Sequence, residues 1–114
     1  ETVADLRRAI RLGDFDRTFA IAERESIELL GVTMTGPENW LYWRPETLAV
    51  LETARTLREQ GVPVYFSADT GATAYLNTTA AAVETVREAI QAQGIPTRVW
   101  QVGGGVEASS DHLF

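Results

Sequence analysis

Apolar side chains recur every three or four residues in four stretches of the chain, which is typical of helices with one buried face. A glycine follows each stretch and is expected to end it, because glycine readily adopts the backbone conformation that closes a helix. The pattern predicts helices from Val3 to Gly13, from Asp14 or Asp16 to Gly31, from Pro45 to Gly61, and from Ala82 to Ile90 with Gly94 beyond it.

Shorter stretches between these helices have the composition or the alternation of strands. The apolar run Val62–Phe66 predicts one strand, with Pro63 near its start, where a missing N–H is tolerated. Alternation predicts a second strand over 72–77 and a last strand over 97–102. Helices followed by strands that pair through tight turns predict an α+β fold, a two-layer sandwich with a mainly antiparallel sheet and helices on one face.

The segment 33–43 is predicted to be a loop rich in aromatic residues. Trp40, Tyr42 and Trp43 are costly to leave in solvent, so they either wall a ligand pocket or, as the favoured interpretation, cover the core. In the preceding helix Ser26 interrupts the apolar face, and we expect its hydroxyl to bond back to a helix carbonyl.

The composition narrows the classes of function. The 114 residues are 45% hydrophobic, which fits one packed domain and argues against disorder. The net charge of −6 disfavours nucleic acid and anionic membrane surfaces as partners. The chain has no Cys, no Lys and a single His112, which excludes thiolate chemistry, lysine Schiff bases and multi-histidine metal sites within it. No apolar run approaches the ~18–20 residues of a membrane helix.

The chain is expected to form a single domain over residues 1–114, with a flexible tail over 103–114. Because it starts at Glu1 and not at Met, and enters a helical pattern directly, we expect it to be a piece of a longer polypeptide. The glycines at 103–105 lack a following helix, so they predict a flexible joint and not a phosphate cradle. The sequence shows no clear interface stripe and leaves a homodimer open.

The turn after the first predicted strand carries the candidate chemistry. Asp69 lies at the strand end, flanked by Ser67, Thr70, Gly71 and Ala72. A carboxylate in such a turn can orient a hydroxyl or accept its proton, and small neighbours let a ligand approach the backbone. From the spacing alone, an aspartate that merely closes the turn is the favoured interpretation.

Several motifs that follow one another in the chain carry a family resemblance. They are Arg24-Glu25-Ser26, Tyr42-Trp43-Arg44-Pro45-Glu46-Thr47-Leu48, Gly61-Val62-Pro63-Val64-Tyr65-Phe66-Ser67 and Asp69-Thr70-Gly71-Ala72. From about Asp14 to the end, the chain resembles the C-terminal region of the mevalonate diphosphate decarboxylase family in the GHMP kinase superfamily. That family usually reads Asp-Ala-Gly-Pro-Asn after the strand, whereas Asp69-Thr70-Gly71-Ala72-Thr73 looks like the archaeal-type phosphomevalonate decarboxylases. The resemblance implies the ferredoxin-like C-terminal fold of the superfamily, and it implies that this chain is the C-terminal domain of a longer enzyme.

The resemblance also implies an ATP-dependent decarboxylase of isoprenoid biosynthesis, in the mevalonate pathway. Such enzymes phosphorylate the tertiary 3-hydroxyl of 5-phosphomevalonate or 5-diphosphomevalonate. Departure of that phosphate and loss of CO2 then give isopentenyl phosphate or diphosphate. Asp69 matches the family's aspartate and would orient or deprotonate the 3-hydroxyl, with Ser67, Thr70, Gly71 and Ala72 beside the substrate. ATP and Mg2+ would bind mainly to an N-terminal part outside this chain, with no metal site in it, and the enzyme would act in the cytoplasm.

Two other functions stay open at this point. One is a mevalonate-type kinase of the same superfamily that stops after phosphoryl transfer, and the presence of Asp69 argues against it. The other is a ferredoxin-like regulatory module that binds a small molecule, in which Asp69 only closes a turn. If the chain is part of a decarboxylase, the isolated 114 residues are expected to be inactive.

Overall fold

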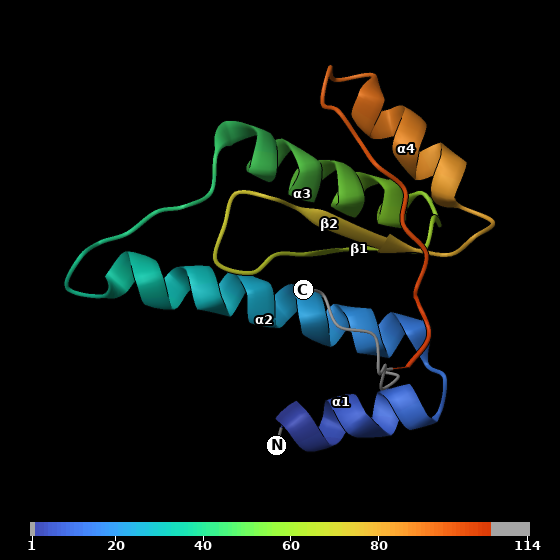
Figure 1. The fold of residues 1–114 in the computed structure, drawn as a ribbon, viewed down its shortest axis with the longest axis horizontal. Coiled ribbons are helices and arrows are strands. Elements are labelled where there is room, and N and C mark those ends of the chain that lie inside the picture. The colour runs from blue at the N-terminus through green and yellow to red at the C-terminus, as the bar shows by residue number, and fades with distance from the viewer. Residues whose placement is uncertain (1, 106–114) are drawn as a thin grey trace, which may run out of the picture.

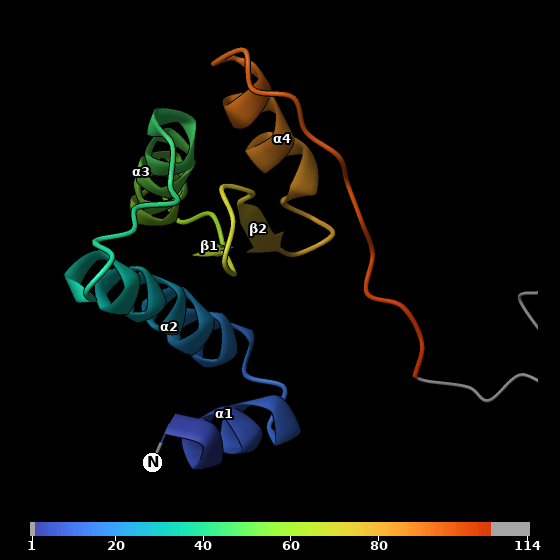
Figure 2. The same cartoon turned by 60° about the vertical axis from the view of Figure 1, so that its left-hand side comes forward.

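The computed structural model describes residues 2–105, which form four helices and one two-stranded sheet. In chain order the elements are α1 (Thr2–Arg11), α2 (Phe15–Thr35), α3 (Pro45–Glu59), β1 (Val64–Ser67), β2 (Tyr75–Thr78) and α4 (Val83–Gln91). The strands pair antiparallel, with Phe66 opposite Leu76. They lie between α2 on one side and α3 with α4 on the other (Figures 1 and 2). The predicted α+β class with an antiparallel sheet is confirmed.

Local signals explain where most helices begin and end. The Asp14 side chain accepts a hydrogen bond from the Arg17 N–H at 3.0 Å and so caps the start of α2. Pro45 is the first residue of α3, where its missing N–H costs nothing. Gly61 follows α3 with a φ of +89°, a conformation that a residue with a side chain adopts only with strain.

The prediction that Gly31 ends the second helix is wrong. α2 continues through it to Thr35 and ends at Gly36, so the first residues of the predicted aromatic loop are helical. A glycine inside a helix costs only about 1 kcal/mol relative to alanine, and packing of the helix can exceed that cost. Leu30, the preceding residue, is buried in the core and fixes this part of α2 against the rest of the molecule.

Two strand predictions also differ from the structure. Residues 72–74 belong to the turn, and β2 starts only at Tyr75. The predicted strand over 97–102 is absent: this segment is extended but unpaired, with Trp100 79% exposed. Figure 2 shows the segment (red) running apart from β2. A strand requires a neighbour for its N–H and C=O groups, and no segment within residues 2–105 supplies one. The predicted tail beyond residue 105, with His112, lies outside the described residues.

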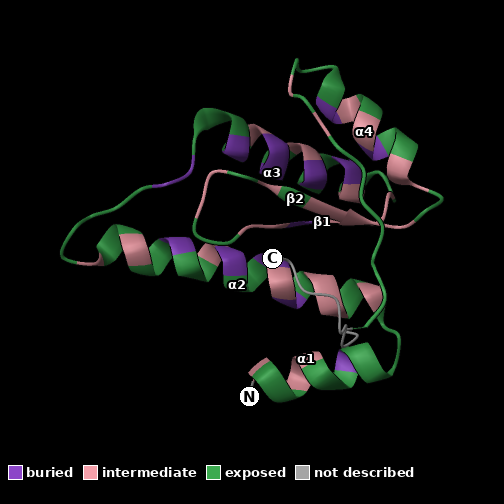
Figure 3. Cartoon of the chain, viewed as in Figure 1, coloured by how far each residue is buried: buried purple, intermediate pink, exposed green. Residues whose placement is uncertain are grey.

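The core lies where α3 and β1 face each other. Figure 3 shows buried positions on the side of α3 that faces the strands and along β1. Val64 and Phe66 are fully buried and alternate with half-buried Tyr65 and Ser67, as expected for a strand with one face on the core. Because Phe66 is fully buried in the core, the end of β1 that leads to Asp69 is held in a fixed position.

The outer edge of β1, away from β2, is covered by side chains from helices. The Phe66 N–H donates to the Glu23 carboxylate at 2.9 Å, and the Ala68 N–H donates to the Ser26 hydroxyl at 3.0 Å. Glu23 and Ser26 both belong to α2. This helix therefore takes the place of a neighbouring strand, which protects an edge that would otherwise be open to pairing with another chain.

Candidate active site

Asp69 lies in the turn that joins β1 to β2. In Figure 1 this turn lies between α2 and the beginning of α3. Asp69 and Thr70 are exposed, whereas Ser67, Gly71 and Ala72 are half-buried. The structure therefore presents the carboxylate to solvent while the turn's two ends rest against the body of the molecule.

Two hydroxyls from different helices hold the backbone of this turn. On one side of Asp69, Ser26 of α2 accepts the hydrogen bond of the Ala68 N–H at 3.0 Å. On the other side, the Thr47 hydroxyl of α3 donates to the Ala72 carbonyl at 2.9 Å. Buried polar groups of a turn need such partners, and here they come from α2 and α3. Asp69 thus lies between two anchored points.

The Ser67 side chain is engaged with the neighbouring strand. Asn77 of β2 donates its amide N–H to the Ser67 hydroxyl at 2.9 Å and to the Tyr65 carbonyl at 3.3 Å. Because the Ser67 oxygen acts as an acceptor in this bond, its own O–H proton is left to donate elsewhere. The arrangement fixes the Ser67 side chain at the base of the Asp69 turn.

Gly71 is not required by the backbone of the turn. Its φ lies outside the left-handed region, and a Cβ atom built on it would meet only the Thr73 nitrogen, at 4.0 Å. This is an ordinary van der Waals contact, so the chain itself would accept a methyl group there. The missing side chain leaves space on the surface of the turn, two residues from Asp69.

Tyr42 adds an electrostatic link to Asp69. Its ring is buried in the core cluster, and its hydroxyl oxygen is buried without a hydrogen-bond partner among the described residues. Burial raises the pKa of Tyr42, and the negative charge of Asp69 raises it further.

Tyr42 and Trp43 are both buried in the core cluster, so they cover the core, which is the favoured interpretation of the aromatic segment. Trp40 remains half exposed, and its ring centroid lies 5.1 Å from that of Tyr42.

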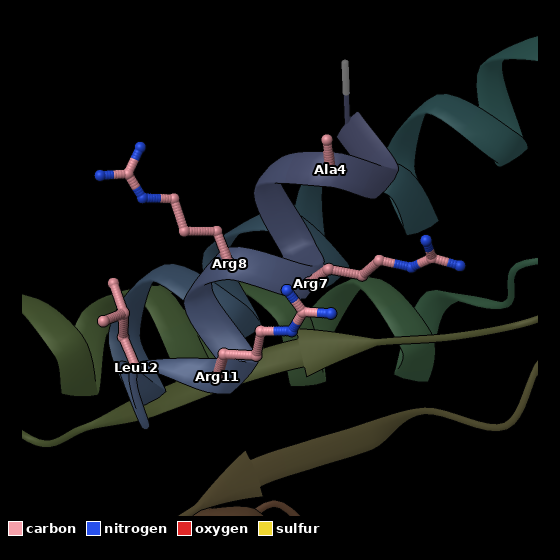
Figure 4. Close-up of a pocket in the computed structure, with 5 residues that line it drawn as sticks. All are labelled: Ala4, Arg7, Arg8, Arg11 and Leu12. Carbon is pink, nitrogen blue, oxygen red and sulfur yellow. The ribbon is translucent and has the colours of Figure 1, made fainter.

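The surface hollow of about 500 Å3 on α1 is a weaker candidate for a site. Arg7, Arg8 and Arg11 line it, but their side chains point in different directions and do not converge on one ligand position (Figure 4).

Among residues 2–105, no three His, Cys, Asp or Glu side chains gather in a metal-binding group. In the same part of the chain, no helix has the length and apolar character needed to cross a membrane.

The sequence located the turn but missed the residues that hold it. The hydroxyl of Ser26 bonds back to the Ala22 carbonyl at 2.8 Å, as expected, and accepts from Ala68 as well. That second bond joins residues 42 positions apart, a separation at which periodicity carries no information. Thr47 showed no signal beyond its place in the first turn of a helix. The assignment of Asp69 and its neighbours as site residues stays a prediction.

Comparison with known proteins gives one close match in sequence. No family model matches the chain. A phosphomevalonate decarboxylase from Haloferax volcanii is 50% identical over 115 residues, which cover 98% of this chain and 36% of that protein. The chain thus spans about a third of the length of this relative.

Solved structures show the same fold. The mevalonate diphosphate decarboxylase from Enterococcus faecalis matches with a TM-score of 0.75 and 24% identity, over 80% of this chain and 28% of that one. The enzyme from Staphylococcus aureus matches with a TM-score of 0.77 and 21% identity, over 81% and 28%. At these identities the likeness establishes the fold alone. Together with the 50% identity over nearly the whole chain, it confirms the resemblance seen in the sequence: over almost its full length the chain is similar to part of a phosphomevalonate decarboxylase, and it has the fold of the matching part of mevalonate diphosphate decarboxylases.

Proposed function

We propose that the complete protein carrying this chain is an ATP-dependent phosphomevalonate decarboxylase of the mevalonate pathway. It converts 5-phosphomevalonate to isopentenyl phosphate and releases ADP, phosphate and CO2. The observation that carries this proposal is the 50% identity to a phosphomevalonate decarboxylase across 98% of the chain. The structural relatives named for mevalonate diphosphate are less than 25% identical, so they weigh less in the choice between a monophosphate and a diphosphate substrate.

We assign the reacting carboxylate to Asp69. The substrate's 3-hydroxyl attacks the γ-phosphorus of ATP, so that an O–P bond forms as the bond to ADP breaks, and the hydroxyl proton must be held or taken up. An exposed carboxylate on an anchored turn can do either. In the second stage the new C–O–phosphate bond breaks together with the bond to the carboxylate carbon. The electron pair of the broken bond to the carboxylate carbon forms the π bond of the alkene as CO2 departs.

The neighbours of Asp69 are proposed to form the substrate side of the turn. The Ser67 hydroxyl, oriented by Asn77, can donate to a substrate oxygen. Gly71 leaves room beside Asp69 that no side chain of the turn fills. Thr70 is exposed and Ala72 half-buried, and both lie within the same short loop. Small residues here permit close approach of a substrate to the backbone.

ATP and Mg2+ are proposed to bind mainly outside this chain. One structural relative is described as a complex with MVAPP, AMPPCP and magnesium. The described residues offer no carboxylate cluster for a metal ion, so we assign no metal ligand to them. When bound, the nucleotide supplies the phosphoryl group, and the residues of this chain orient the acceptor hydroxyl.

The test uses the complete protein with ATP and Mg2+. Release of ADP and CO2 is measured with 5-phosphomevalonate and with 5-diphosphomevalonate. We expect CO2 from the monophosphate, and a loss of kcat on the order of 10²–10⁴-fold in Asp69→Asn, the range typical of general acid–base groups. Asp5→Asn removes the same charge at a half-buried position of α1, where Asp5 pairs with Arg17, and is expected to keep the parent's kcat.

Each other outcome has a definite meaning. CO2 from the diphosphate alone would move the substrate assignment to the other branch of the family. ADP without CO2 would make the protein a kinase. No turnover of either compound, with Asp69→Asn indistinguishable from the parent, would overturn the proposed function.

A further inference from the structure

We infer that Ser26 and Thr47 are positioning residues for Asp69. Their hydroxyls hold the backbone of the turn on its two sides, and so set where the carboxylate stands. This inference rests on the proposed function, because the position of Asp69 matters most if that side chain meets the substrate.

Ser26 holds the near side of the turn. It is 6% exposed, in the middle of α2. Its hydroxyl donates to the Ala22 carbonyl at 2.8 Å and accepts from the Ala68 N–H at 3.0 Å. Both roles of the hydroxyl are thereby used, which fixes its orientation. The atom that it holds belongs to the residue immediately before Asp69.

Thr47 holds the far side in the same manner. It is 3% exposed, in the first turn of α3. Its hydroxyl accepts from the Arg44 N–H at 3.1 Å and donates to the Ala72 carbonyl at 2.9 Å. The start of α3 and the end of the Asp69 turn are therefore joined by a single buried atom.

The Asp69 carboxylate has no such restraint of its own. It is exposed, and among the described residues no hydrogen bond to its oxygens holds it in place. Its position therefore depends on the backbone between Ala68 and Ala72. A misplacement of about 1 Å can lower a rate by about 100-fold, so loss of either anchor should act on the chemical step. A purely structural role would lower stability and leave kcat unchanged.

The first experiment measures kcat and KM for CO2 release by the complete protein with 5-phosphomevalonate. In Ser26→Ala and Thr47→Val we expect kcat to fall about 10-fold or more, with KM within about twofold of the parent. Thr47→Ser keeps the hydroxyl and should recover most of the loss. Ser26→Cys keeps the side-chain volume, but its sulfur accepts hydrogen bonds weakly. It carries the same test if Ser26→Ala fails to fold.

Thr53 of α3 provides the matched control. Thr53 is half-buried, whereas Ser26 and Thr47 are buried, but its hydroxyl makes the same two kinds of bond: it donates to the carbonyl four residues earlier at 2.8 Å and accepts from Gln93 at 2.7 Å. It makes no bond to the Asp69 turn. Thr53→Ala should therefore keep the parent's kcat. An equal loss of kcat in Thr53→Ala and Ser26→Ala would contradict a positioning role.

The second experiment asks whether Ser26 acts through Asp69. In an Asp69→Asn background, Ser26→Ala should change kcat by less than about twofold, because the group that it positions is gone. If the two losses simply multiply, Ser26 does not act through Asp69 and the inference is wrong.

A third readout separates this inference from the proposed function. Hydrogen exchange at the Ala68 amide should be about 10-fold faster in Ser26→Ala than in the parent, whatever the protein catalyses, because the hydrogen bond that protects this amide is lost. Unchanged exchange would refute the anchor itself. If the parent releases CO2 and needs Asp69 while Ser26→Ala keeps full kcat, only the positioning role fails. If exchange accelerates but no CO2 is released by the parent, the proposed function fails.

Discussion

Glu23 and Arg58 form a two-point ion pair beside the outer edge of β1. Arg58 Nη2 lies 2.9 Å from Glu23 Oε1, and Arg58 Nη1 lies 3.0 Å from Glu23 Oε2. The same two side chains also bind the strand, since Glu23 accepts from the Phe66 N–H and Arg58 donates to the Val64 carbonyl, each at 2.9 Å. The pair therefore joins α2, α3 and the strand that leads to Asp69. It satisfies backbone groups that a neighbouring strand would otherwise satisfy.

Removal of Glu23 should destabilise the protein far more than removal of a surface glutamate. Glu23→Ala leaves the Phe66 N–H and the Arg58 guanidinium without their acceptor, and we expect a loss of about 3 kcal/mol in the free energy of unfolding. The Arg58 side chain is 30% exposed, so water recovers part of the cost. The measurement is urea unfolding followed by tryptophan fluorescence.

Glu84→Ala is the control for this prediction. Glu84 forms an ion pair with Arg87 at a shorter distance, 2.7 Å, but the Glu84 side chain is 62% exposed, against 9% for Glu23, and that of Arg87 is 42% exposed. Such pairs contribute about 0–1 kcal/mol. Equal losses in the two variants would mean that burial and the bonds to β1 contribute nothing, contrary to our account.

The sequence predicted the features that depend on near neighbours in the chain. The spacing of apolar residues located all the helices of the described part, and the Asp69 turn followed from the end of an apolar run. The ion pair could not be predicted, because Glu23 lies 35 residues from Arg58 and 43 from Phe66. The segment 97–102 also shows that local sequence does not specify contacts between distant parts of the chain. Its alternation is that of a strand, but pairing depends on a neighbour that local sequence does not specify.

Substitution of Gly31 tests whether α2 continues through this residue. It lies inside α2, and a Cβ atom added to it would have no neighbouring atom within 4 Å, so Gly31→Ala should stabilise the protein by about 0.5–1 kcal/mol. Gly61→Ala, at a φ of +89°, should instead destabilise it by about 1 kcal/mol. Both values come from urea unfolding. A loss of stability in Gly31→Ala would show that α2 does not continue through this residue.

The Gly71→Ala variant is expected to affect substrate binding but not the stability of the protein. Gly71→Ala adds a methyl group whose nearest neighbour is the Thr73 nitrogen at 4.0 Å, so the free energy of unfolding should change by less than about 0.5 kcal/mol. If the substrate approaches this turn, the same methyl group should raise KM for 5-phosphomevalonate about 10-fold, since it occupies space that the substrate needs. Parent-like kinetics in Gly71→Ala would place the substrate elsewhere.

Tyr42 makes the stability of the protein depend on alkaline pH. Its pKa is raised from the ordinary 10.0, first by burial of the phenol and then by the charge of Asp69. Below pH 10 the tyrosine is protonated in both the folded and the unfolded chain, so its titration does not change the stability there. Above pH 10 the unfolded chain releases this proton while the folded chain retains it. Stability is therefore lost as the pH rises from 10 through the folded pKa.

The experiment compares urea unfolding of the parent and of Tyr42→Phe between pH 8 and pH 12. Tyr42→Phe should lose less stability at alkaline pH, although Tyr65, whose pKa is also raised by burial and by Asp16, keeps part of the dependence. At pH 8 the variant should be as stable as the parent or up to about 1 kcal/mol more stable, because it removes a buried hydroxyl without a partner. Asp69→Asn should lower the pKa of Tyr42, measured by the ultraviolet absorbance of tyrosinate, since one of the two causes of its rise is gone. An unchanged titration in Asp69→Asn would show that the charge of Asp69 does not act on Tyr42.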